Sequence, residues 1–152
     1  SGEKPWSYMN LSGRVLKLLG ISLSSEMVKK VPNETKMWRA VIVLALEDVL
    51  NTSNNRNECV LKARSHDWFI SDSDDFQQVC FNAELDPEWV RDRYQRALDT
   101  GQVKFTKKQH LQVKYSDMYD RFRREKDVKR RKRLQKLVDK LRLRIFRLVT
   151  KT

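Results

Sequence analysis

The sequence contains a segment of 34 residues, 116–149, that has neither glycine nor proline. The segment holds 14 Lys or Arg and 5 Asp or Glu, and Ser116 stands at its start as a suitable helix cap. Because no residue in it breaks a helix, the segment predicts one long helix, which at 1.5 Å per residue would extend over about 50 Å. We therefore expect residues 116–152 to form a basic C-terminal helix.

The predicted helix carries an apolar seam with alternating spacings of four and three residues. The seam consists of Leu134, Val138, Leu141, Ile145 and Leu148. Two heptads alone make a weak coiled coil. The seam therefore predicts either docking on the protein's own body or self-association into a homo-oligomer, and the sequence does not choose between them.

A basic stripe lies about 100° around the same helix from the apolar seam. The stripe consists of Lys129, Arg133, Lys136, Lys140, Arg144 and Arg147. A phosphate backbone is the simplest partner for so many like charges on one helix. The run 129–133 also fits a nuclear-localisation signal, and the stripe fits a membrane surface. Arginines crowd the apolar side, so the membrane interpretation is weaker.

The positive charge is confined to the last third of the chain. Residues 1–100 hold 13 Lys or Arg and 15 Asp or Glu, a net charge of −2, whereas residues 101–152 hold 19 and 5, a net charge of +14. This asymmetry predicts a polyanion-binding arm on a nearly neutral body. The whole chain has 152 residues, of which 39% are hydrophobic. This predicts one domain with a modest core, or one small domain with an appendage.

No sequence feature indicates a membrane span or secretion. The longest apolar run, Ala40–Leu46, is far shorter than the roughly 20 residues that span a bilayer. The N-terminus carries no basic-then-apolar signal segment. We expect a soluble protein without membrane partners, in the cytoplasm (of a bacterial host cell, if the chain is phage-derived).

Catalytic and metal-binding patterns are also missing from the sequence. Cys59 and Cys80 form no CxxC motif, and His66 and His110 have no second His or Cys at ligand spacing. His66-Asp67 resembles a base with its orienting acid, but no nucleophile motif or Gly-rich phosphate loop accompanies it. We predict no metal, no cofactor and no enzymatic activity.

Helical periodicity organises the first 70 residues. Residues 1–32 are predicted to be a helical lead-in, with helices over 11–19 and 25–30. A helix over 37–50, capped by Asn33 or Thr35, has apolar residues on nearly every face and is predicted to be the buried core helix. A loop over 51–55 and a helix over 58–68 follow, so that 33–115 forms the helical core.

Two short helices predicted next match helix-turn-helix anatomy. Ser73 or Asp74 caps a helix over 75–83, residues 84–86 form the turn, and Asp86 with Pro87 begins a helix over 87–98. In a helix-turn-helix, here about 74–98, the second helix enters the major groove of DNA.

The segment Phe76–Arg91 resembles the helix-turn-helix segments of many phage and bacterial DNA-binding proteins. Together with Trp38-Arg39-Ala40-Val41, it is also similar to short proteins of proteobacterial phages and prophages, over about residues 37–98. In two places the sequence departs from the usual motif: Glu84 replaces the small turn residue, and Arg93 occupies a position that is often apolar. The likeness to helix-turn-helix segments implies DNA binding, and the similar phage proteins bring no activity that could be transferred to this chain.

The charge of this segment conflicts with tight DNA binding. Residues 71–100 hold 3 Lys or Arg and 8 Asp or Glu, a net charge of −5. Arg91, Arg93, Gln95 and Arg96 are the candidates for base or phosphate contacts, because Arg pairs with guanine and Gln with adenine. Alternatively, the two helices only pack in a small bundle, or the acidic face contacts a protein partner.

Downstream, residues 103–106 and 111–115 alternate apolar and polar side chains. Period two favours a β-hairpin over 102–115, which would be the wing of a winged helix-turn-helix. Lys104, Lys107, Lys108 and Lys114 would then contact DNA from the wing. An extended linker or the start of the last helix is the alternative.

The sequence thus predicts a mainly α protein that binds nucleic acid without chemistry, most simply duplex DNA, as a phage or bacterial regulator. A genome-packaging subunit resembling small terminases, a protein-binding adaptor (for example to polymerase) and an RNA-binding protein are the alternatives. The predicted DNA contacts are Arg91, Arg93, Gln95, Arg96, Lys104, Lys107, Lys108, Lys129, Arg130, Arg133, Lys136, Lys140, Arg144 and Arg147.

Overall fold

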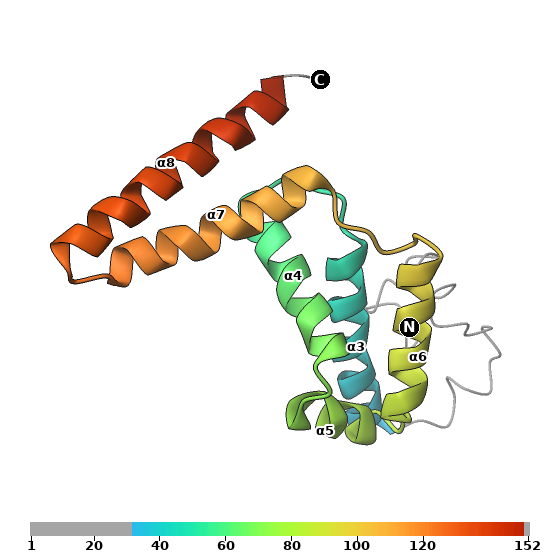
Figure 1. Ribbon diagram of the computed structural model, residues 1–152. Coiled ribbons are helices and arrows are strands. Elements are labelled where there is room, and N and C mark those ends of the chain that lie inside the picture. Colours follow the sequence, from blue (N-terminus) through green and yellow to red (C-terminus); the bar gives the residue numbers. More distant parts are fainter. Residues whose placement is uncertain (1–31, 151–152) are drawn as a thin grey trace, which may run out of the picture. The chain divides into compact units, whose positions relative to one another are not determined.

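The computed structural model describes residues 32–150, and within this range it contains six helices and no strand. The mainly α fold class is therefore confirmed. The helices, labelled as in Figure 1, are α3 (Asn33–Leu50), α4 (Arg56–Ile70), α5 (Asp74–Asn82), α6 (Pro87–Asp99), α7 (Lys107–Arg124) and α8 (Val128–Thr150). The helices predicted over 11–19 and 25–30 lie outside the described residues.

The chain divides into two compact units that share α4. In the described range, unit 1 consists of residues 32–50 and 64–104, and unit 2 consists of residues 51–63 and 105–150. Unit 1 thus contains α3, the second half of α4, α5 and α6. Unit 2 contains the first half of α4, α7 and α8.

Local capping explains where α5 and α6 begin. The Ser73 side chain accepts a hydrogen bond from the Phe76 N–H (3.1 Å), and the Asp86 side chain accepts one from the Glu88 N–H (3.1 Å). Pro87 occupies the start of α6, where its missing N–H costs nothing. The helices predicted over 75–83 and 87–98 are confirmed, with Ser73 as the cap of the first. Glu84, in the turn between them, has φ 57°, in the region that favours glycine.

The core of unit 1 joins the four helices of its described part. Its buried residues include Ile42, Leu46 and Val49 of α3, Phe69 of α4, Phe76 and Cys80 of α5, and Val90, Tyr94 and Ala97 of α6. The rings of Phe69 and Tyr94 stack at 4.4 Å between centroids, and the Phe76 ring lies edge-on to Phe69 at 6.1 Å.

The core helix predicted over 37–50 is confirmed as α3, but burial of its whole circumference is wrong. Met37 is 56% exposed and Leu44 is 61% exposed. Among the described residues, α4, α5 and α6 leave these two side chains of α3 uncovered. Hydrophobicity alone therefore overestimated how much of this helix is buried.

A histidine–tyrosine pair makes the stability of unit 1 depend on pH. His66 Nδ1 lies 2.7 Å from the Tyr94 hydroxyl, and burial lowers the pKa of His66, against the opposing charge of Asp67. Because the folded pKa lies below the unfolded value of 6.5, the unfolded chain binds more protons as the pH falls through this range. We therefore expect the free energy of unfolding to decrease from pH 7.5 to 5.5 in urea titrations. The His66→Gln variant should show a flatter dependence over the same range, and an unchanged slope would contradict this assignment.

In unit 2, α7 and α8 pack together as an antiparallel hairpin (Figure 1). Leu111 and Tyr115 of α7 and Val138 and Leu141 of α8 are buried, with Met118, Tyr119, Phe122, Ile145 and Leu148 packed against them. Of the five seam residues, Val138, Leu141, Ile145 and Leu148 therefore belong to the cluster between α7 and α8. Self-association stays a prediction.

The β-hairpin predicted over 102–115 is wrong, because residues 107–115 belong to α7. The reason is a capping box: the Thr106 hydroxyl accepts from the Gln109 N–H, and the Gln109 side chain accepts from the Thr106 N–H. The helical spacing of Leu111, Tyr115 and Met118 then buries one side of α7 against α8. The period-two alternation covered too few residues to outweigh these two signals.

The single helix predicted over 116–149 is also wrong, because α7 ends at Arg124 and α8 begins at Val128. Asp127 caps α8: its side chain accepts from the Arg130 N–H (3.2 Å), and its carbonyl accepts from the Arg131 N–H (2.9 Å). A reversal at 125–127 lets the apolar seam pack on α7. That burial compensates for the hydrogen bonds that a continuous helix would have kept.

A buried lysine ties α7 to the rest of unit 2. Lys62 is 1% exposed, and its Nζ donates to the Asn51 carbonyl (2.7 Å) and the Gln109 side-chain oxygen (3.0 Å). Charge-assisted hydrogen bonds of this kind are among the stronger ones in proteins. We expect Lys62→Ala to lower the free energy of unfolding by about 3 kcal/mol in denaturant titrations. The exposed neighbour Arg64→Ala should change it by less than about 0.5 kcal/mol, and equal effects would contradict the anchoring role.

Candidate nucleic-acid interface

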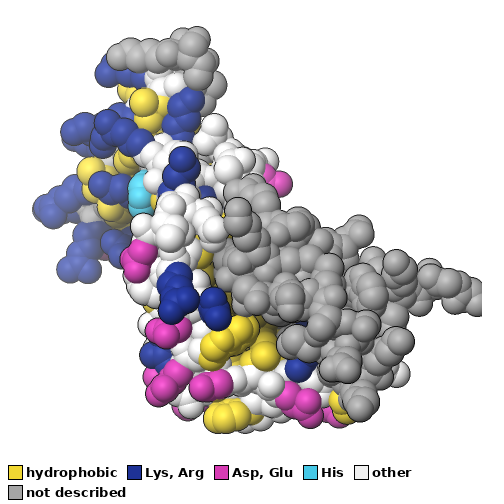
Figure 2. Space-filling model, turned by 90° about the vertical axis from the view of Figure 1, so that its right-hand side faces the viewer, with side chains coloured by type: hydrophobic (Ala, Val, Ile, Leu, Met, Phe, Trp, Pro, Cys, Tyr) yellow, Lys and Arg dark blue, Asp and Glu magenta, His cyan; other side chains and the backbone are white. Residues whose placement is uncertain are grey.

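The two units have opposite net charge. Residues 33–50 and 64–104 hold 7 Lys or Arg and 12 Asp or Glu, a net charge of −5. Residues 51–63 and 105–152 hold 20 and 6, a net charge of +14. Figure 2 shows the same division on the surface, with Lys and Arg gathered over the part with α7 and α8 and Asp and Glu prominent over the part with α5. A polyanion is therefore attracted to unit 2.

The basic stripe lies along the exposed side of α8. All six of its residues and Arg130 are exposed, while Val138 and Leu141, about 100° around the helix, are buried against α7. Within residues 32–150, no ion pair joins Lys129, Arg133 or Lys136 to a carboxylate, and the Arg130 guanidinium reaches Asp127 only at 4.0 Å. Lys129, Arg133 and Lys136 thus present their positive charge to solvent.

Two lysines that were predicted to lie on a wing extend this surface from α7. Lys114, Lys140 and Arg144 surround a shallow groove whose floor includes Met118, Leu137 and Leu141. Lys107 lines a neighbouring hollow with Arg144, Arg147 and Leu148. The hairpin therefore brings Lys107 and Lys114 together with the basic stripe. Lys108 lies half-buried on the first turn of α7, and Lys104 belongs to unit 1, where it is exposed.

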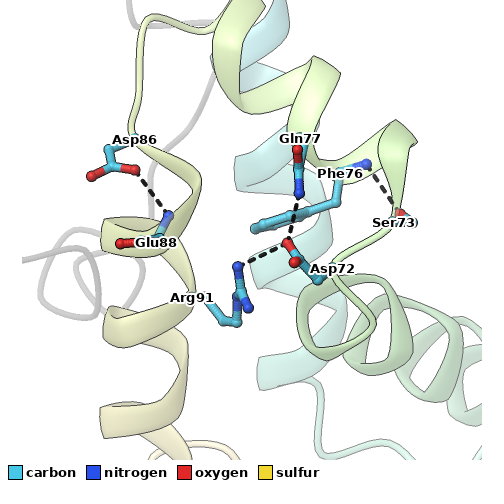
Figure 3. Close-up of polar contacts among 7 residues, drawn as sticks. All are labelled: Asp72, Ser73, Phe76, Gln77, Asp86, Glu88 and Arg91. Carbon is cyan, nitrogen blue, oxygen red and sulfur yellow. Dashed lines mark hydrogen bonds and ion pairs between the residues drawn. The ribbon is translucent and has the colours of Figure 1, made fainter.

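The candidate contacts on α6 have partners within unit 1. The Arg91 guanidinium binds the Asp72 carboxylate at 2.8 Å, and Asp72 also accepts from the Gln77 amide at 3.1 Å (Figure 3). The Gln95 amide donates to Asp99 at 3.0 Å, and the Arg93 guanidinium carbon lies 5.4 Å from the centre of the Trp89 ring. Arg96 is exposed.

The surface around these α6 residues is acidic. An open hollow on α6 is lined by Asp86, Glu88, Trp89, Arg91, Asp92 and Gln95. The three carboxylates would repel a phosphate that approached this face. To contact a base, Arg91 would first have to give up its ion pair with Asp72. Sequence reasoning did not find that pair, because Asp72 lies in the loop before α5 and its partner lies on α6.

Sequence reasoning also missed a group of arginines that lie over aromatic rings in unit 2. The guanidinium carbons of Arg56 and Arg142 lie 5.6 and 5.8 Å from the centre of the Tyr115 ring. Arg131 lies 5.0 Å from the Phe122 ring, and Arg123 lies 6.0 Å from the Tyr119 ring. The three aromatic residues recur on one side of α7 at helical spacing, which is the signal that could have indicated this face.

The described residues contain no candidate metal site, and both of their cysteines are buried. No cluster of three or more His, Cys, Asp or Glu side chains within residues 32–150 could hold a metal ion. Burial raises the pKa of the Cys80 thiol to about 11 and also raises that of Cys59, so both thiols are protonated at neutral pH. None of the helices in the described range is long and apolar enough to cross a membrane.

Comparisons with known proteins identify no relative: no protein-family model, curated protein or solved structure matches this chain.

Proposed function

We propose that this chain is a non-enzymatic protein that binds double-stranded DNA by holding the phosphate backbone with its α7–α8 hairpin. The observation that carries the proposal is the surface formed by the basic stripe with Lys107 and Lys114, which is exposed on a helix held in place by the packing of Val138 and Leu141 against α7. Rigid support matters because charges on a fixed helix bind phosphates without first losing much conformational freedom.

The dimensions of the stripe fit a duplex. Lys129 and Arg147 are 18 residues apart on one helix, or about 27 Å at 1.5 Å per residue. Each strand of B-DNA has one phosphate per 3.4 Å of the duplex axis, so an axial length of about 27 Å contains about eight phosphates of each strand. A helix about 10–12 Å in diameter also matches the width of the major groove of B-DNA, whereas the deep, narrow major groove of RNA excludes it.

Unit 1 has a secondary part in this proposal. The α5–α6 pair of unit 1 supplies sequence preference only where α6 approaches the edges of the bases. The acidic residues of α6 limit the contribution of unit 1 to DNA affinity. Within this scheme the chain acts as a phage or bacterial DNA-binding regulator, with non-specific affinity from unit 2 and register from unit 1.

The assignment of roles is tested by removing the candidate contacts of α6. We expect the full chain carrying Arg93→Gln and Arg96→Gln to bind a random-sequence duplex within about threefold of the unaltered protein, because two peripheral charges contribute little beside the hairpin. Fluorescence anisotropy with a labelled duplex measures this. A loss of tenfold or more would place the main contact on α6 instead of the hairpin.

A second function is supported by the acidic hollow on α6. Asp86, Glu88 and Asp92 line it beside the Trp89 ring, a combination suited to a basic, partly apolar peptide. In that case the chain is an adaptor, and charge reversal at Glu88 and Asp92 abolishes capture of the protein partner but leaves DNA binding intact. Charge reversal on the basic stripe would have the opposite pattern.

A further inference from the structure

A small hollow in unit 2 lies outside the basic stripe. It has a volume of about 210 Å³ and is lined by Arg56, Gln112, Tyr115, Arg142 and Ile145. These residues come from the start of α4, from α7 and from α8, so the hollow exists only when the three helices of unit 2 are assembled.

The floor of the hollow is a fixed aromatic ring. Tyr115 is 8% exposed, and the guanidinium carbons of Arg56 and Arg142 lie 5.6 and 5.8 Å from the centre of its ring. Arg142 Nη2 donates a hydrogen bond to the Tyr115 hydroxyl at 3.1 Å. The ring therefore holds both guanidinium groups beside one small space, and the cation–π contacts reduce their freedom before any ligand binds.

Two like charges at one ring repel each other unless an anion compensates them. In the described part of the chain, neither Arg56 nor Arg142 forms an ion pair with a carboxylate. Asp139 raises the pKa of Arg142 through its charge, after the larger effect of the Tyr115 hydrogen bond, but no ion pair joins the two residues. The hollow thus has two positive groups and no internal counter-ion at hydrogen-bond distance.

The remaining groups suit a tetrahedral oxyanion. The Tyr115 oxygen accepts from Arg142, so its own proton is available to an anion in the hollow. The Gln112 amide donates to the Asn54 carbonyl at 3.0 Å, which fixes this wall of the hollow. Arginine forks are suited to phosphate because they donate two parallel hydrogen bonds.

We propose that this hollow is a phosphate-binding pocket in which Arg56 and Arg142 hold one phosphate group and Tyr115 donates a third hydrogen bond. The pocket differs from the basic stripe because it places two exposed guanidinium groups and a tyrosine hydroxyl around one hollow. It binds a single phosphate by geometry, and the phosphate belongs either to a nucleic acid (as a terminal group or a backbone diester) or to the free ion. The pocket does not depend on the function proposed above.

The test is a titration of the full chain with inorganic phosphate at constant ionic strength, followed by NMR of the arginine side chains. We expect saturable shifts at the Nε–Hε signals of Arg56 and Arg142. Because Arg142→Lys keeps the charge but loses the fork, we expect it to weaken binding about tenfold. Arg56→Lys should act similarly, and Arg124→Lys, an exposed arginine at the end of α7, should have no effect. Equal, non-saturating shifts at all arginines, or unchanged affinity in both pocket variants, would overturn the proposal.

The source of the phosphate is distinguished with two oligonucleotides, one bearing a 5′-phosphate and one a 5′-hydroxyl. Tighter binding of the phosphorylated one, lost in Arg142→Lys, supports a terminal phosphate. Equal binding of both, weakened in Arg142→Lys, supports a backbone diester. Failure of the pocket would leave duplex binding by the basic stripe unchanged, so the two proposals are separable.

Discussion

Replacing Lys129, Arg133 and Lys136 together by glutamine is expected to weaken duplex binding by the full chain on the order of 100-fold at 0.1 M salt. Each residue is exposed on α8 and unpaired with carboxylates in the described range, so each is free to contact a phosphate. Each lost phosphate contact also removes about 0.9 from the slope of log affinity against log salt, so the slope should become less steep by about 2.7. Anisotropy titrations at several salt concentrations measure both quantities.

A matched triple variant in unit 1 controls for the change in net charge. Lys36, Arg64 and Arg96 lie in the acidic unit, and glutamine at these three positions changes the net charge by the same amount. We expect it to change duplex affinity less than about threefold and to leave the salt slope unaltered. If both triple variants weaken binding equally, the protein binds through its overall charge and not through the α7–α8 surface.

The second large effect is expected in the core of unit 1. Phe69→Ala removes a ring that is 0% exposed, stacks on Tyr94 at 4.4 Å and lies edge-on to Trp68 at 5.2 Å. Truncation of a buried phenylalanine costs the burial of its ring and leaves a cavity, which together lower the free energy of unfolding by about 4 kcal/mol. Chemical denaturation monitored by circular dichroism measures this loss.

The neighbouring residue on α4 gives the control for this variant. Ile70 is 45% exposed, so Ile70→Ala should lower the free energy of unfolding by about 1 kcal/mol or less. If Phe69→Ala is no more destabilising than Ile70→Ala, then Phe69 does not join α4 to α6 through the Tyr94 ring as described.

Features set by a few adjacent residues could be predicted from the sequence. The start of α6 is determined by Asp86 and Pro87, and the start of α5 by Ser73, all within one helical turn of the bonds they make. The pair Thr106 and Gln109 is an equally local signal for the start of α7. The β-hairpin was predicted because the short alternation of apolar and polar side chains over 103–115 was considered without this capping box.

Features that depend on tertiary packing could not be predicted in this way. The reversal at 125–127 follows from the burial of Val138 and Leu141 against α7, which periodicity alone does not distinguish from a continuous helix. The basic stripe was predictable because it belongs to one helix. Its proximity to Lys114 is set by the hairpin, and the Asp72–Arg91 ion pair by the packing of unit 1.

A binding experiment on a truncated chain would be ambiguous. A truncated chain ending at Tyr115 would cut α7 in its middle and remove α8, which leaves the buried side of α7 without a partner. Loss of binding in such a fragment would report unfolding as well as loss of charge. Substitutions of exposed residues in the full chain avoid this ambiguity.

The most direct test of DNA binding by the α7–α8 hairpin is the salt dependence of the unaltered full chain on a random-sequence duplex. If the six stripe residues with Lys107 and Lys114 each contact one phosphate, the slope of log affinity against log salt is about −7, and duplex is preferred over structured RNA of equal length. A slope near zero, or no binding to duplex at 50 mM salt, would contradict this function.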